Sequence, residues 1–155
     1  MSNDVCGYIS PSLDLEGENN LDRYKKNQKI GIIEIGKEQL YNFPVSFLPM
    51  DGCYAFLIGD RPDYPNATYL IDYLDYASEA DIGFPLSGKE RLNILLDVLR
   101  DIFIITNAQK MVIALTDGNQ IEHTRKIKFS ELYDVIHADF ELHEAPPDTL
   151  YEITL

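Results

Sequence analysis

The chain has 155 residues, of which 45% are hydrophobic and 25% charged, a composition typical of a folded globular domain. Its 26 acidic and 13 basic residues give a net charge of −13, which argues against direct binding of nucleic acid because the phosphates would be repelled. No segment approaches the roughly 20 apolar residues of a membrane span, and the amino-terminal residues lack the pattern of a secretion signal. We therefore expect a cytoplasmic protein that does not enter a membrane, with Cys6 and Cys53 as free thiols.

The first third of the chain predicts an arm followed by a hairpin. Residues 1–28 have weak periodicity and several turn formers, which predicts a partly ordered arm with little core, so that the single domain spans residues 29–155. Residues 29–35 (KIGIIEI) are β-branched and predict a largely buried strand. Residues 42–52 contain two prolines and predict an irregular link or edge strand, and residues 53–59 (CYAFLIG) predict the central strand that completes the hairpin.

Residues 59–66 (GDRPDYPN) predict a loop, and the conformation of residues 67–80 after it is open between helix and strand. A helix capped by Asn66 would present acids on one side and place tyrosines between these acids and the core: Asp72, Asp75, Glu79, Tyr69, Tyr73 and Tyr76. A strand over residues 68–73 would instead place Tyr69, Ile71 and Tyr73 on one face.

The clearest helix follows Ser87. Ser87 and Glu90 have the spacing of a capping box, in which each side chain satisfies a free amide of the first turn. Apolar residues then recur at steps of three and four, and the charged residues fall largely on the opposite side; the apolar set is Leu92, Leu95, Leu96, Leu99, Ile102 and Phe103, and the charged set is Arg91, Asp97, Arg100 and Asp101. This pattern predicts the main core helix.

The last third predicts two strands, a short helix and a final strand. Residues 110–129 carry two β-rich runs around Asp117-Gly118, which predicts a hairpin whose second strand is half exposed. A helix capped by Ser130 then runs to Phe140, and residues 148–155 predict the last strand. The element order indicates an α+β fold, a mostly antiparallel sheet with two or three helices packed on it, in a single domain.

The residues with chemical potential form no strong motif. His137, Asp139, His143 and Glu144 lie within eight residues and could supply nitrogen and oxygen ligands to zinc, but helical spacing does not bring a second ligand next to His137. His123 could act as a general base, although a structural, hydrogen-bonded histidine explains it as well. The chain also lacks the glycine-rich phosphate loops and the hydrolase motifs, so we predict no metal, no cofactor and no catalytic residue, and a binding protein rather than an enzyme.

The negative charge is concentrated in two segments. Residues 60–81 hold six acids and one base, and residues 131–155 hold seven acids and no base, so that the two segments carry −12 of the net −13. Tyrosine provides a large contact area with few rotatable bonds, and surrounding acids steer a basic partner. The alternative is that these tyrosines border the core and the acids only keep the protein soluble.

In size, acidity and α+β character, residues 29–155 resemble the small acidic bacterial immunity proteins that neutralise a cognate toxin. The resemblance implies a cytoplasmic protein that occludes a basic partner, such as the nucleic-acid-binding surface of a nuclease-type toxin. The residues expected to contact this partner are Asp60, Asp63, Tyr64, Asp72, Tyr73, Asp75, Tyr76, Glu79 and Asp81, with Glu141, Glu144 and Asp148 as a second patch.

Three alternatives remain. A secretion chaperone would be equally small and acidic but would dimerise through an apolar helix face, whereas the helix after Ser87 has one apolar face and therefore favours a monomer over a dimer. A DNA-mimicking inhibitor would differ only in its partner. A small enzyme would need a deep pocket that joins His123 or His137 to acids.

Overall fold

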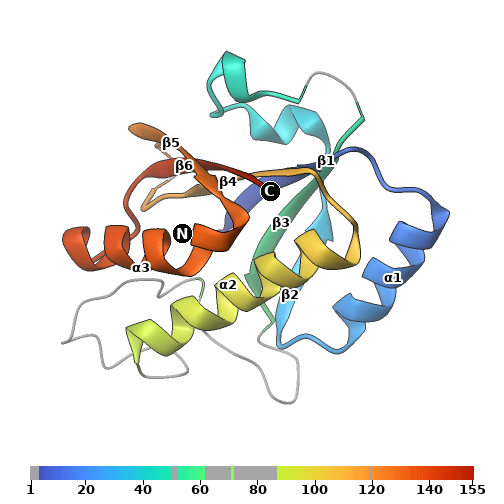
Figure 1. The fold of residues 1–155 in the computed structure, drawn as a ribbon, viewed down its shortest axis with the longest axis horizontal. Helices are drawn as coiled ribbons and strands as arrows, with labels where there is room; N and C mark the ends of the chain where they lie inside the picture. The colour runs from blue at the N-terminus through green and yellow to red at the C-terminus, as the bar shows by residue number, and fades with distance from the viewer. Residues whose placement is uncertain (1–3, 50–51, 62–70, 72–86, 119) are drawn as a thin grey trace.

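The structure is a computed structural model that describes residues 4–49, 52–61, 71, 87–118 and 120–155. These residues form one sheet with helices on one side (Figure 1). The strands are β1 (Val5–Ser10), β2 (Ile30–Glu34), β3 (Tyr54–Asp60), β4 (Lys110–Leu115), β5 (His123–Lys128) and β6 (Thr149–Thr154). They lie in the order β2-β3-β1-β4-β6-β5. Neighbouring strands are antiparallel except β5 and β6, which are parallel. The predicted α+β fold with a mostly antiparallel sheet is confirmed.

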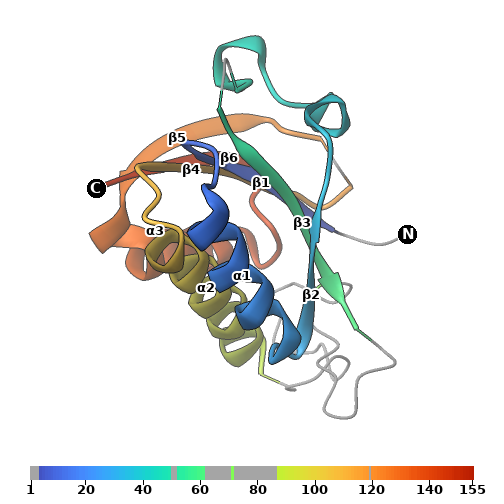
Figure 2. The same cartoon turned by 90° about the vertical axis from the view of Figure 1, so that its right-hand side faces the viewer.

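Two hydrophobic cores cover the two faces of the sheet. The helices α1 (Leu15–Lys26), α2 (Gly88–Ile105) and α3 (Leu132–His143) pack on one face, as Figure 2 shows, and enclose the larger core. The other face is partly covered by the link between β2 and β3, with its short 3-10 helices η1 (Lys37–Leu40) and η2 (Val45–Phe47). Leu40 and Phe43 of this link pack on Tyr8 of β1, whose hydroxyl donates a hydrogen bond to the carbonyl oxygen of Phe47 at 2.5 Å. Val112, Ala114 and Leu150 belong to the same smaller core and are buried.

The prediction of a partly ordered arm is wrong for the described part of residues 1–28. Strand β1 lies in the interior of the sheet, with Val5, Tyr8 and Ile9 buried, and Asp14 caps α1 by accepting the N–H of Gly17 at 2.7 Å. Glycine is needed at position 7 of this strand. A Cβ atom at Gly7 would lie 2.4 Å from the carbonyl oxygen of Val112, so only glycine allows β4 to approach this closely.

The predicted hairpin between β4 and β5 is also wrong, because β6 lies between these strands. Leu150, Tyr151 and Ile153 of β6 are fully buried, whereas Ile127 is the one buried residue of β5. A strand that is apolar on both faces is stable in the interior of a sheet, and a polar strand can serve as its edge. Gly118 nevertheless has a positive φ of 102°.

Three smaller differences concern the helices. The predicted cap at Ser87 is confirmed, because its hydroxyl accepts the N–H of Glu90 at 3.5 Å. Ser130 does not cap a helix; it lies in η3 (Phe129–Glu131), and α3 follows from Leu132. Arg91 was placed on the polar side of its helix but is fully buried. The open question of helix or strand at residues 67–80 lies outside the described residues, apart from Ile71.

Candidate functional site

The strand order brings five acidic residues to one edge of the sheet. The registers pair Val5 with Ile58, Cys6 with Ala114, and Thr149 with both Leu115 and His123, so β1, β5 and β6 begin where β3 and β4 end. The acidic residues at these strand ends are Asp4, Asp60, Asp117, Glu122 and Asp148, which we call the acidic edge. With a spacing of about 4.8 Å between strands, β3 to β5 span about 19 Å.

Asp148 holds two of the other acids in place. Its carboxylate accepts the N–H of Asp117 at 2.7 Å, and its carbonyl oxygen accepts the N–H of Glu122 at 2.8 Å and of His123 at 3.1 Å. These bonds fix the loop from β4 to β5 against the start of β6. The side chains of Asp117 and Glu122 are exposed, whereas Asp148 is half-buried. Asp148 therefore acts at this edge first as a loop anchor and only second as a surface charge.

The carboxyl-terminal end of α3 adds two acids and an apolar side chain beside this edge. Glu141, Leu142, His143 and Glu144, which we call the α3 tip, are all exposed, and Leu142 has 78% of its surface accessible. Glu144 ends the helix with a φ of 57°, and the chain then passes into β6 on the side where β1 begins (Figure 1). An exposed leucine between two carboxylates is suited to contact a partner that is basic around an apolar patch.

The opposite edge of the sheet has charges of both signs: Glu34 ends β2 there, beside two lysines. Lys110 begins β4 and Lys128 ends β5, both at the edge away from Asp148. Glu152 of β6 is the carboxylate between Lys110 and Lys126, at 3.8 and 3.6 Å. Among the described residues that flank the acidic edge, the Lys and Arg side chains are Lys29 and Arg61, next to β2 and β3. Among the described residues, the strand ends near Asp148 are therefore more negative than those at the opposite edge, without a complete separation of charge.

Other acids and tyrosines serve the fold. Tyr24 of α1 donates a hydrogen bond to Asp101 of α2 at 2.7 Å, and Tyr133 of α3 donates one to Asp97. Arg100 joins the two acids, at 3.1 Å from Asp101 and 3.5 Å from Asp97. Burial, and second the hydrogen bonds to these carboxylates, raise the pKa of both tyrosines. This network links the three helices, so its acids are internal partners rather than a docking surface.

Most of the residues predicted in residues 60–81 lie outside the described part of the chain: Asp63, Tyr64, Asp72, Tyr73, Asp75, Tyr76, Glu79 and Asp81. Of this segment the structure describes Asp60, Arg61 and Ile71. Ile71 is fully buried in the larger core, and its N–H donates a hydrogen bond to the carboxylate of Asp60 at 3.0 Å. The second predicted patch, Glu141, Glu144 and Asp148, is described and lies at the acidic edge. No local pattern predicts that Asp4, Asp117 and Glu122 join the acidic edge, because only strand order brings them there.

The residues considered above as zinc ligands, His137, Asp139, His143 and Glu144, do not form a shared metal site. His137 contacts Asn93 of α2, with 2.6 Å between Nε2 and Oδ1, and burial, then the charge of Lys89, lowers the pKa of His137. Asp139 instead accepts hydrogen bonds from Arg125 at 2.7 Å and Tyr151 at 2.7 Å. The structure shows no group of three or more His, Cys, Asp or Glu side chains able to hold a metal ion within the residues it describes. His123 is exposed on β5.

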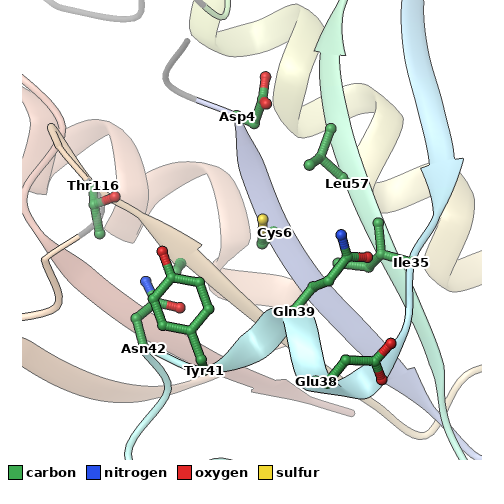
Figure 3. Close-up of a pocket in the computed structure, with 10 residues that line it drawn as sticks. Asp4, Cys6, Ile35, Glu38, Gln39, Tyr41, Asn42, Leu57 and Thr116 are labelled. Atoms are coloured by element: carbon green, nitrogen blue, oxygen red, sulfur yellow. The ribbon is translucent and has the colours of Figure 1, made fainter. Parts of the chain in front are cut away.

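A pocket of about 350 Å³ opens beside the acidic edge on the sheet face away from the helices (Figure 3). Cys6 and Leu57 contribute to it from the sheet, Asp4 lies at one end, and Gln39 and Tyr41 lie on the side of η1. Burial, and second the charge of Asp4, raise the pKa of the Cys6 thiol. The thiol is therefore protonated at neutral pH, which does not suit a nucleophile.

None of the helices that the structure describes is long and apolar enough to cross a membrane. In comparisons with family models, curated proteins and solved structures, the chain matches none of them.

Proposed function

We propose that the protein binds a basic protein partner through the acidic edge and the α3 tip, and blocks that partner by covering its active surface. This is the mode of action of an immunity protein against a nuclease-type toxin. The observation that carries the proposal is the uneven distribution of charge among the described residues: five acids with Lys29 and Arg61 flank one edge of the sheet, whereas Lys110 and Lys128 with Glu34 flank the other.

Physical estimates support this role for the edge. Neighbouring strand ends lie closer together than the Debye length of about 8 Å at physiological salt, so the carboxylates act on a partner as one negative surface. Such a surface accelerates the encounter with a basic partner and orients it, more than it strengthens the final complex. Leu142, 78% exposed in the α3 tip, supplies apolar contact area that charge alone does not provide.

The apolar face of α2 supports a monomer. Its residues Leu92, Leu95, Leu99, Ile102 and Phe103 are buried in the protein's own core. This face is therefore not free for the helix-mediated dimer that a secretion chaperone needs. The proposal accordingly has one copy of the protein binding one basic domain.

The test compares two charge-reversal pairs. The first pair, Glu141→Lys with Glu144→Lys, reverses the two charges of the α3 tip. The control pair, Glu16→Lys with Glu18→Lys, reverses two exposed acids in the first turn of α1, which follows the opposite edge of the sheet. Immobilised wild-type protein first captures its partner from the native cell, and the product of the neighbouring reading frame is the first candidate. The purified partner is then assayed for toxicity, and for inhibition of that toxicity by the protein.

We expect the α3-tip pair to slow association with this partner by about tenfold at low salt, because rim charges act mainly on the association rate. The α1 pair should leave the rate within about twofold, and high salt should remove the difference between the variants. The same assay applies to reversal of Asp72 and Asp75, which should weaken binding with little change in stability. An unchanged rate for the α3-tip pair, or equal slowing by the α1 pair, would contradict the assignment of this surface.

A further inference from the structure

The two outer strands of the sheet differ in how their edges are protected. β5, at one end, carries Arg125, Lys126 and Lys128, and charged side chains on an outer strand discourage pairing with another chain. β2, which Figure 2 shows at the other side of the sheet, has no charged residue from Ile30 to Ile33. Ile33 is 58% exposed. β2 is therefore the edge to which a further strand can add.

The hydrogen-bond register shows which groups of β2 point outward. Ile35 donates its N–H to the carbonyl oxygen of Ala55 at 3.0 Å, and in an antiparallel pair the residues that bond to the neighbouring strand alternate with those that do not. The N–H and C=O groups of Ile30, Ile32 and Glu34 therefore point away from β3. Among the residues that the structure describes, these groups have no hydrogen-bond partner. Three residues thus offer main-chain bonds to a strand alongside β2.

A hollow of about 230 Å³ lies beside this edge. Gly31 and Gly59 lie opposite each other in the register and line the hollow without side chains. Arg61 borders it: its Cγ atom lies 3.2 Å from the position of a Cβ atom at Gly31, and its guanidinium donates a hydrogen bond to the carbonyl oxygen of Gln28 at 3.1 Å. Gly31 and Ile33 belong to the same face of β2, because side chains alternate along a strand. The edge therefore carries an exposed isoleucine and, two residues before it, a recess.

We infer that β2 pairs with β2 of a second copy of the protein, antiparallel and about a two-fold axis at Ile32. In this register Ile33 of each copy lies opposite Gly31 of the other, so each isoleucine side chain enters the hollow of the other copy. There it contacts the glycine backbone and the methylene groups of Arg61. The pairing adds about six main-chain hydrogen bonds, two for each of three residue pairs, and joins the two sheets into one.

Two features favour a second copy over another protein as the occupant. The exposed side chain and the recess that fits it lie on the same strand, which is the condition for a self-complementary contact about a two-fold axis. The charges also agree, because Ile30 lies opposite Glu34 in this register, and each acid therefore comes close to Lys29 of the other copy. The inference goes beyond the proposed function: the dimer uses neither the α3 tip nor the buried apolar face of α2, so each copy still binds one basic domain.

Sedimentation velocity of the full chain measures the dimer directly. We expect a dissociation constant of about 10 μM, so that most of the protein is monomeric at about 1 μM and dimeric at about 100 μM. Ile33→Lys removes the apolar side chain and places a charge on the edge, and should raise the dissociation constant at least about tenfold. Ile104→Lys is the matched control, because Ile104 is 56% exposed but lies on α2, and it should change the constant by less than about twofold. Urea unfolding checks that both variants are folded.

Hydrogen exchange of single amides, followed by NMR at about 100 μM, locates the contact without depending on a substitution alone. In wild type, the N–H groups of Ile32 and Glu34 should exchange about threefold more slowly than in Ile33→Lys, because the second copy supplies their acceptors. The N–H of residue 33 bonds to β3 in both proteins and should change less. The amides of β5 should exchange at equal rates in both.

A monomer at about 100 μM would overturn the inference. So would a dimer that Ile33→Lys leaves unchanged, or slowed exchange at β5 in place of β2. These results are independent of the proposed function, which is tested by association with the basic partner. A monomer whose α3-tip variants associate slowly would retain the acidic edge, and a β2 dimer with an unchanged association rate would retain the dimer alone.

Discussion

Replacing Gly7 by alanine tests the strand order on which the acidic edge depends. The added Cβ atom would lie 2.4 Å from the carbonyl oxygen of Val112, 2.8 Å from Cγ2 of Ile113 and 3.2 Å from its Cα. Two of these atoms belong to the backbone of β4, so a rotamer change cannot relieve the clash, and β1 and β4 must separate locally. Overpacking of this kind costs about 1–3 kcal/mol, and weakening one or two ladder hydrogen bonds adds about 1 kcal/mol. We therefore expect Gly7→Ala to lower the free energy of unfolding by about 3 kcal/mol.

The measurement is urea unfolding followed by far-UV circular dichroism. With a slope of about 2 kcal/mol per molar urea, a loss of 3 kcal/mol moves the midpoint down by about 1.5 M. Gly118→Ala is the matched control, because no atom lies within 4 Å of its Cβ position and only its φ of 102° opposes alanine. That variant should lose about 1–2 kcal/mol. A Gly7→Ala midpoint within about 0.3 M of wild type would refute the close approach of β1 and β4.

Three further predictions concern hydrogen bonds described above. Burial, followed by the charge of Glu152, raises the pKa of Tyr8 to about 12, so the folded state keeps its proton above pH 10 where the unfolded chain loses it. Stability should thus fall by about 2 kcal/mol between pH 10 and 12, and Tyr8→Phe should flatten that part of the pH profile in urea titrations. Asp148→Ala should cost about 1–2 kcal/mol in thermal unfolding, whereas Asp148→Asn should stay near wild type because its amide oxygen can still accept the N–H of Asp117. Asp139→Ala should cost about 2–4 kcal/mol, since it leaves the buried Tyr151 hydroxyl without its acceptor, and a double-mutant cycle with Tyr151→Phe should show that most of this loss is shared.

The helix after Ser87 could be predicted because its information is local. Leu92, Leu95 and Leu99 repeat at helical spacing, Ser87 supplies the cap, and the structure buries these leucines as the pattern requires. Arg91 was misplaced by the same reasoning, because a helical wheel treats every arginine as exposed. Its burial depends on what packs around it, and a single helix contains no information on that.

Strand order could not be predicted, because it is decided by pairing between distant segments. Gly118 has the positive φ that favours glycine, but a turn signal does not specify which strand takes the next place in the sheet. The segment around Gly7 belongs to residues 1–28, whose weak periodicity predicted an arm, and its strand depends on pairing with distant segments. The same limit applies to the site: Glu141 and Glu144 were found from local charge, whereas the approach of Asp4 and Asp117 toward them requires the whole sheet.

The position of β6 has a consequence for synthesis of the protein. This strand comes after β5 and α3 in the chain but lies between β4 and β5, making antiparallel bonds to one and parallel bonds to the other. A nascent chain that has already released β4 and β5 from the ribosome still has two unpaired strand edges facing each other. The sheet can close only after residues 149–154 emerge, so chaperone contact with this half should persist until then.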